Sequence, residues 1–317
     1  MPGPIAPPDP ALLEPAPSLP GRMLPRIGAD GRQPRLIYAA TPPAVPPGDH
    51  RIAILVEGIG LSAALTREAI ETLPPAISLA VSPHAAELKR AGAATPLLDE
   101  ARKLGHELLL SLPMQPASRN DDEGPHALDS NAPEVVNRAD LFWVLSRLQG
   151  YAGVTGAFGG MAGERFSSSS MFTAVAEELR DRGLFYVPPR PDAPPADGEP
   201  VRPLPGGLFR APVSVVLDEQ PDAADITARL SRLEQIAASG DGAIGLAGPL
   251  RPVVVERLRS WSAHLAERGF VLVPVSSFQA AGPATPSRPA VAPDVVPDIA
   301  PATRDAPSTP SPAGAHP

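Results

Sequence analysis

Between residues 51 and 279, short apolar runs of strand length alternate with longer segments of helical pattern, and this alternation constrains the fold most strongly. The apolar runs cover residues 52–56, 77–81, 108–112, 153–158, 184–187, 213–217, 243–246 and 271–275. The clearest helical segments cover residues 95–104, 133–149, 169–182, 223–238 and 252–268. Strands that are apolar on both faces and separated by helices are typical of a parallel sheet covered by helices.

Roughly seven or eight strand–helix units in about 230 residues match a barrel better than an open sheet. We therefore predict a single (β/α)7–8 barrel-like α/β domain, and an open doubly wound sheet is the alternative. Local signals mark the helix ends: Thr95 is expected to cap a helix that has Pro96 at its first position. Glycines stand where a left-handed residue would end a helix, at Gly105, Gly150, Gly183 and Gly269.

Proline sets the domain boundaries, because many of the 45 prolines lie outside the alternating region. Residues 1–21 and 280–317 are rich in Pro and Ala and are predicted to be disordered arms, since they offer too little apolar surface to offset chain entropy. Residues 22–50 contain two apolar patches and are predicted to form an extended strap leading into the domain. The remaining segment, residues 51–279, is the domain itself, interrupted by a Pro-rich surface loop at 188–205.

Composition excludes several function classes. The chain has no cysteine, which removes disulfides, thiolate-bound metals and thiol nucleophiles. Its net charge is −8 and it has no basic cluster, so nucleic acid is not expected as a partner. No run approaches the roughly 18 apolar residues of a membrane span, and no export segment is recognised. We expect no membrane span in this chain, and the sequence leaves its location open.

In a parallel α/β barrel, ligands bind where the strands end. The predicted strand ends carry Glu57-Gly58, Ser82-Pro83-His84, Pro113-Met114-Gln115, residues 157–160, residues 188–190, Asp218-Glu219, residues 247–249 and Ser276-Ser277. Any chemistry of this chain should therefore come from these positions.

Several segments, taken in order, resemble the divergent polysaccharide deacetylases of the NodB-like deacetylase superfamily. The matching segments are Leu-Pro-Arg-Ile-Gly at 24–28, Ile-Leu-Val-Glu-Gly-Ile-Gly-Leu-Ser at 54–62, Gly-His-Glu at 105–107, Leu-Pro-Met-Gln-Pro at 112–116, Gly-Tyr-Ala-Gly-Val at 150–154, Arg-Gly-Leu-Phe-Tyr-Val at 182–187, Gly-Ala-Ile-Gly at 242–245 and Val-Pro-Val-Ser at 273–276. The resemblance covers about residues 22–278. It implies a barrel-like fold and a metal-dependent hydrolase of acetamide C–N bonds, in which a divalent ion polarises the carbonyl and activates water.

The departures from the family pattern fall on the residues that would hold the metal. The family's Asp-Asp pair is Glu57-Gly58 here, its Asn-His is Gly156-Ala157, and its Gly-His-Pro is Ala247-Gly248-Pro249 in this or a close alignment. Its Asp-Ser-Arg-Thr has become residues 188–191, Pro-Pro-Arg-Pro, and Gln115 replaces the Glu of Pro-Met-Glu-Pro. A catalytic zinc normally needs three protein ligands, and Gly and Ala supply none. We therefore expect no cofactor.

Three side chains at strand ends remain candidates for chemistry. Glu57 and Asp218 are the catalytic candidates, although Glu57 could simply accept hydrogen bonds from water and Asp218 could cap the following turn. His84 is the metal-ligand candidate, and its alternative is a solvated histidine at a helix start.

Arg190 and Gln115 are the substrate-binding candidates. Arg190 keeps the basic side chain of its motif and could bind a sugar carboxylate or an acetyl oxygen, or face water. His106 begins its strand, at the end of the barrel opposite to the site, so Gly105-His106-Glu107 is interpreted as structural.

The sequence thus predicts a member of this family linked to carbohydrate metabolism that has lost hydrolysis and binds a glycan or a protein partner. The alternative is an active deacetylase with a rearranged site, in which Glu57, His84 and Asp218 hold zinc or another divalent metal. A third possibility is an interaction protein whose Pro-rich arms recruit partners. The resemblance suggests a periplasmic or envelope location, with a glycan or an envelope protein as partner.

Overall fold

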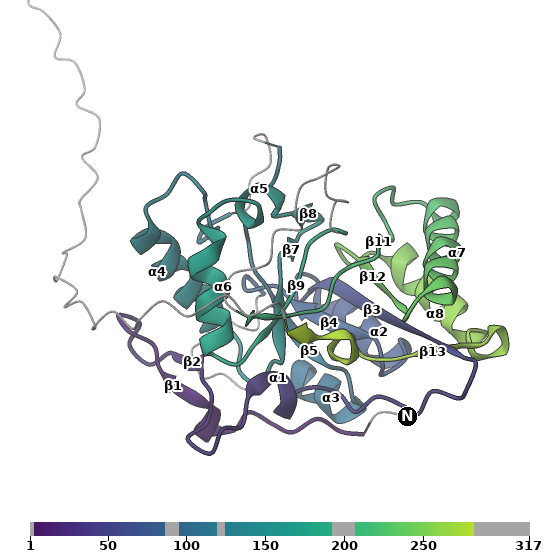
Figure 1. Cartoon of the computed structure of the whole chain (residues 1–317), viewed down its shortest axis with the longest axis horizontal. Coiled ribbons are helices and arrows are strands. Elements are labelled where there is room, and N and C mark those ends of the chain that lie inside the picture. Colours follow the sequence, from purple (N-terminus) through teal and green to yellow (C-terminus); the bar gives the residue numbers. More distant parts are fainter. Residues whose placement is uncertain (1–2, 86–94, 119–123, 192–206, 282–317) are drawn as a thin grey trace, which may run out of the picture. The chain divides into compact units, whose positions relative to one another are not determined.

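A curled, mainly parallel sheet organises the structure, a computed structural model that describes residues 3–85, 95–118, 124–191 and 207–281 (Figure 1). Its strands are β3 (His50–Ile59), β4 (Ser78–Val81), β5 (Leu108–Ser111), β6 (Gly153–Thr155), β9 (Phe185–Val187), β10 (Phe209–Arg210), β11 (Val215–Val216), β12 (Ala243–Ala247), β13 (Phe270–Leu272) and β14 (Ala280–Ala281). Two ribbons lie outside it, formed by β1 (Leu13–Pro15) with β2 (Met23–Pro25), and by β7 (Ala157–Phe158) with β8 (Met161–Ala162).

The strands pair in the order β11-β12-β3-β4-β5-β6-β9-β10-β14, and β13 pairs with the first residues of β3. All these pairs are parallel except β10 with β14. Within the described residues no ladder joins β11 to β14, so the sheet curls without closing. The predicted barrel-like α/β domain is confirmed in this half-barrel form.

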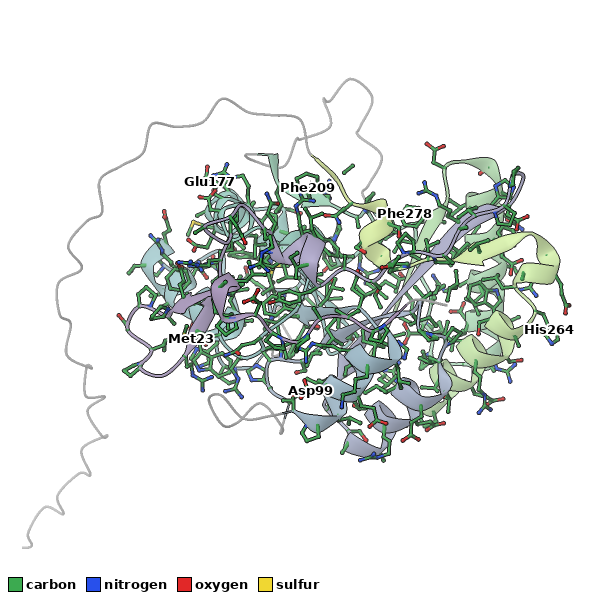
Figure 2. All side chains as sticks on the ribbon, turned by 90° about the horizontal axis from the view of Figure 1, so that it is seen from below. Met23, Asp99, Glu177, Phe209, His264 and Phe278 are labelled. Carbon is green, nitrogen blue, oxygen red and sulfur yellow. The ribbon has the colours of Figure 1, made fainter. Side chains whose placement is uncertain are left out.

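The core lies on both faces of the sheet, because its strands are apolar on both sides. In β3, Ile52, Ile54 and Val56 join one buried cluster, while the alternate residues Ala53 and Leu55 join the other. Figure 2 shows side chains filling the space between the sheet and its helices, with Met23 and His264 at opposite sides of this part of the chain.

The helices are α1 (Pro34–Ile37), α2 (Ala63–Thr72), α3 (Pro96–Leu104), α4 (Glu134–Leu145), α5 (Glu164–Ser167), α6 (Phe172–Asp181), α7 (Ala223–Ser239) and α8 (Pro252–Ala263), with 3-10 turns at η1 (Pro10–Leu12), η4 (Ala266–Arg268) and η5 (Val275–Phe278). Helices α7, α8, α2 and α3 pack in that order against one another, and α4 packs on α6. None of the helices formed by the described residues has the length and apolar character that a bilayer crossing requires.

The observed helix ends agree in part with those predicted from the sequence. Gly105 and Gly269 adopt the left-handed conformation directly after their helices, as predicted. Thr95 precedes Pro96 as expected, but its side chain makes no capping hydrogen bond. Helix α4 stops at Leu145, short of the predicted end at residue 149.

The N-terminal segment differs from the prediction of a disordered arm over residues 1–21. Residues 3–21 carry η1 and β1, and Leu12 is fully buried in the same cluster as Leu55. Tyr38 in the predicted strap is also buried, and its hydroxyl accepts a hydrogen bond from Asp9 N at 2.9 Å. Residues 3–21 therefore pack on the domain, because Ile5 and Leu12 are buried in its core. The predicted disorder of the C-terminal tail covers residues 280–317. Ala280 and Ala281 instead form β14, which pairs with β10, and residues 282–317 lie outside the described residues.

His106 and Glu107 have structural contacts at the start of β5, as interpreted from the sequence. Both are fully buried. The His106 ring nitrogens lie 2.9 Å and 3.1 Å from the carbonyl oxygens of Ile77 and Ile70. The Glu107 carboxyl accepts hydrogen bonds from Ala40 N and Ser276 N, and burial raises its pKa. This carboxyl therefore joins the strap, the sheet and the last turn of the domain.

Candidate functional site

A pocket of about 400 Å³ opens at the C-terminal ends of β3, β11 and β12. It is lined by Glu57, Ala157, Gly160, Pro189, Arg190, Val216, Asp218, Glu219, Pro221, Leu246, Gly248, Pro249 and Arg251. Five of the predicted strand ends therefore meet here, which is where ligands bind in parallel α/β folds. Its volume is in the range of small-molecule sites.

Glu57 lies at the bottom of this pocket, where the pairing of β3 with β4 shifts register between Val56 and Ile59. Its side chain is directed away from solvent, and only 2% of the residue is exposed. Two backbone N–H groups at the turn between β7 and β8 hold the carboxyl: Gly160 N donates to Oε1 at 2.7 Å and Gly159 N to Oε2 at 3.1 Å.

Burial raises the pKa of Glu57 to about 7, against the opposing effect of the hydrogen bonds from Gly160 and Gly159, and the nearby charge of Asp218 raises it further. The carboxyl therefore changes its charge near neutral pH.

Asp218 follows β11, and its carboxyl is buried beside Glu57. Gly248 N donates to Oδ1 at 2.9 Å, whereas Oδ2 has no hydrogen-bond donor among the described residues. The nearest cation to Oδ2 is Arg251 Nη1 at 3.6 Å, too far for a hydrogen bond. Burial raises the pKa of Asp218 to about 6, opposed by the Gly248 hydrogen bond and by Arg251.

Two of the positions at which the sequence departs from the resembled pattern, Gly58 and Gly248, have no room for a side chain. A Cβ atom on Gly248 would lie 2.1 Å from Glu57 Cγ, and one on Gly58 would lie 2.8 Å from Leu250 N. Gly58 also has a φ of +88°, a conformation that side-chain-bearing residues rarely adopt. The Glu57 side chain occupies the space that a residue at 248 would need.

The donor set of the pocket does not fit the divalent ion that the resemblance implies. Ala157 and Gly248 offer no ligand atom, and the Glu57 oxygens are directed at backbone N–H groups. Among the described residues, no three His, Asp or Glu side chains come together in a way that could hold a metal ion. The side chains that line the pocket therefore do not form a divalent-ion site.

Arg190 lines the pocket, but carboxylates already hold its guanidinium. Its Nε donates to Glu164, and its Nη1 donates to Glu219 at 2.7 Å. Glu219 also accepts from Arg229 Nη2 at 2.8 Å, which extends the ion-pair network. Arg190 therefore fixes loops at the rim of the pocket.

Gln115 is not among the pocket residues. Its Oε1 accepts from Ser130 Oγ at 2.5 Å and from Ser130 N at 3.2 Å, so its side chain holds a neighbouring loop. Gln115 was predicted at a strand end, whereas β5 ends at Ser111, and the sequence could not show which way its side chain is directed.

His84 also lies outside the pocket, within a group of rings. Its imidazole centroid is 5.5 Å from that of Trp143 and 5.6 Å from that of Phe158. Burial lowers its pKa, and the nearby His126 and Arg147 lower it further. The three-residue arrangement of Glu57, His84 and Asp218 on one metal is therefore not assembled.

Sequence reasoning missed Arg251 as part of the site. It placed residues 157–160 at a strand end but did not predict that Gly159 and Gly160 hold the Glu57 carboxyl. Arg251 stands directly before Pro252 at the start of α8, in the loop that follows β12. A polar residue between a strand end and a helix start is a usable signal in this fold class. No local pattern shows the contact of Gly160 with Glu57, because it depends on packing across about 100 residues of chain.

Comparisons with known proteins agree with this architecture. The family model described as divergent polysaccharide deacetylase matches residues 54–279. A crystal structure of an uncharacterised protein from Agrobacterium tumefaciens C58 is 28% identical, with a TM-score of 0.68, over 81% of this chain and 99% of that one.

The catalytic domain of a peptidoglycan N-acetylglucosamine deacetylase from Eubacterium rectale ATCC 33656 is 13% identical, with a TM-score of 0.44, over 74% of this chain and 92% of that one. No curated protein matches the chain.

Proposed function

The chain belongs to the divergent polysaccharide deacetylase family, and from this premise we propose that it binds polysaccharide in the pocket at its strand ends without deacetylating it. The observation that carries the proposal is the contact between Glu57 and Gly248. The Glu57 side chain occupies the space that a metal-binding side chain at position 248 would need.

The loss of hydrolysis is supported by the donor set. Metal-assisted deacetylation needs an ion to polarise the carbonyl and to activate water. Gly58 and Gly248 stand at two positions where the family has metal-binding side chains, and neither has space for one. Restoring a single ligand would not rebuild three-ligand coordination.

Retention of binding is supported by the shape and the polarity of the pocket. A carboxyl group of Asp218 and the guanidinium of Arg251 line it next to apolar surface from Pro249 and Leu246. Sugars present hydroxyl groups at their edges and apolar faces between them, and such a mixed surface suits both. A location in the cell envelope is part of this proposal, because polysaccharide is the material that the family description names.

The test combines a binding assay with an activity assay on the full chain. We expect the protein to sediment with insoluble peptidoglycan, chitin or cellulose, and to release no acetate from acetylated glycans with or without added zinc. Asp218→Asn serves as the pocket variant and should reduce sedimentation, and Glu68→Gln on the exposed face of α2 is the control. Stoichiometric zinc in the purified protein together with acetate release would overturn the proposal.

One observation favours a second candidate, a hydrolase with a rearranged site. Glu57 and Asp218 are neighbouring carboxyl groups whose pKa values are raised to about 7 and about 6, and such pairs can transfer protons near neutral pH. Acetate release that disappears in Glu57→Gln would support this candidate.

A further inference from the structure

Asp218 and Arg251 face each other across a gap that is too wide for a hydrogen bond. Asp218 Oδ2 and Arg251 Nη1 are 3.6 Å apart. The Asp218 side chain is fully buried, and its Oδ2 accepts no hydrogen bond from the described residues. A buried carboxylate oxygen without a donor is costly, so the position favours a ligand that supplies one.

The Arg251 guanidinium also has N–H donors that a ligand in the pocket can use. The 3.6 Å ion pair with Asp218 is its one polar contact within the part of the chain that the structure describes. Its side chain is 39% exposed and lines the pocket, so a ligand in the pocket can reach it. A guanidinium has only N–H donors and therefore requires an acceptor.

A hydroxyl group satisfies both partners together, because it donates one hydrogen bond and accepts others. A ligand ammonium has no acceptor for Arg251, and a ligand carboxylate has no donor for Asp218. Each charged group would also lie beside a protein group of its own sign. The other charged side chains of the pocket are already engaged: Glu57 by backbone N–H groups, and Arg190 by Glu164 and Glu219.

We propose that Asp218 and Arg251 are a specificity-determining pair that binds a hydroxyl group of an uncharged glycan between Oδ2 and the guanidinium. This inference rests on the proposed polysaccharide binding and adds its ligand class. Neutral sugars are selected over amino sugars with a free ammonium group and over uronic acids.

The test measures binding by isothermal titration calorimetry with five oligosaccharides of similar length. The neutral probes are fully N-acetylated chitopentaose, cellopentaose and xylopentaose. The charged probes are de-N-acetylated chitosan pentamer and pentagalacturonate. We expect the tightest binding from a neutral probe, with at least about 10-fold weaker binding of both charged probes.

Two pocket variants test the pair itself. Asp218→Asn keeps an acceptor for Gly248 N but replaces Oδ2 with a donor, and Arg251→Gln removes the guanidinium. Each should weaken binding of the neutral probe by about 10-fold or more without lowering the melting temperature. The double variant should bind the neutral probe almost as tightly as the single variant with the lower affinity, since both contacts hold one hydroxyl group. Arg257→Gln, on the same helix α8 and paired with Glu256, is the matched control and should bind normally.

The outcomes separate the two proposals. Binding of a neutral probe that neither pocket variant changes overturns the Asp218–Arg251 pair and leaves polysaccharide binding standing. If a charged probe binds most tightly, the proposed selection of neutral sugars is wrong, and polysaccharide binding still stands. If no probe and no insoluble polysaccharide binds the wild-type chain, both proposals are wrong.

Discussion

At the scale of single residues, the Glu57 carboxyl is subject to opposing effects: burial favours its neutral form, and two backbone N–H groups favour its charged form. Burial has the larger effect, so the pKa is about 7 in the folded chain against an ordinary value of 4.5. A carboxyl with a raised pKa stabilises the fold fully below its ordinary pKa, and this contribution is lost as the pH rises through the folded-state value.

The pH dependence of stability should reveal this carboxyl. From pH 4.5 to above pH 7, the free energy of unfolding should fall by up to about 3 kcal/mol more in the wild type than in Glu57→Gln. Urea unfolding followed by circular dichroism between pH 4.5 and 8 measures the difference. Glu68→Gln should follow the wild-type curve, whereas parallel curves for Glu57→Gln and the wild type would contradict the prediction.

The contact between Gly248 and Glu57 gives a second prediction at this scale. Gly248→Ala should lower the free energy of unfolding by about 1–3 kcal/mol, because its methyl group would overlap Glu57 Cγ. The loss should be smaller when Glu57→Ala is already present, since the overlapping atoms are then gone. A double-mutant cycle measured by urea unfolding checks the coupling, and strict additivity would show that the contact does not matter.

At the scale of secondary-structure elements, helix α7 begins at a well-formed cap. The Asp222 side chain accepts hydrogen bonds from Ala224 N and Asp225 N, both at 2.9 Å. Asp222→Ala should lower the free energy of unfolding by about 1 kcal/mol, while Asp222→Asn, which can still accept, should cost much less. Equal losses for the two variants in chemical denaturation would argue against a capping role.

The elements show what sequence can predict. Strands β4, β5 and β12 lie within about a residue of their predicted bounds, because each is a fully buried apolar run with clear ends. Strands β10 and β14 have two residues each, too few for any periodicity, and they were not predicted.

The sequence predicted the candidate site to a similar extent as the strands. Glu57 and Asp218 followed from the rule that strand ends meet at one edge of the sheet. The directions of Gln115 and His84 and the contact of Arg251 with Asp218 depend on packing between distant segments, which no local pattern encodes.

At the scale of the whole molecule, residues 3–21 belong to the folded domain. Besides the buried Leu12, Arg182 links them to the barrel through an ion pair with Glu14 at 2.8 Å. Deleting residues 1–21 should lower the melting temperature by about 5–10 °C, because the deletion removes buried apolar surface and this ion pair. Differential scanning calorimetry measures the change, and an unchanged melting temperature would show that the segment is dispensable.

The packing of Glu57 against Gly248 also constrains how this sequence can change over generations. A histidine at 248 would overlap the Glu57 side chain, whether or not a metal is present. Position 57 has to shorten first, and that step alone leaves the amides of Gly159 and Gly160 without their acceptor. A side chain can therefore be added at 248 only together with a change at 57, and each change made singly is expected to weaken the fold.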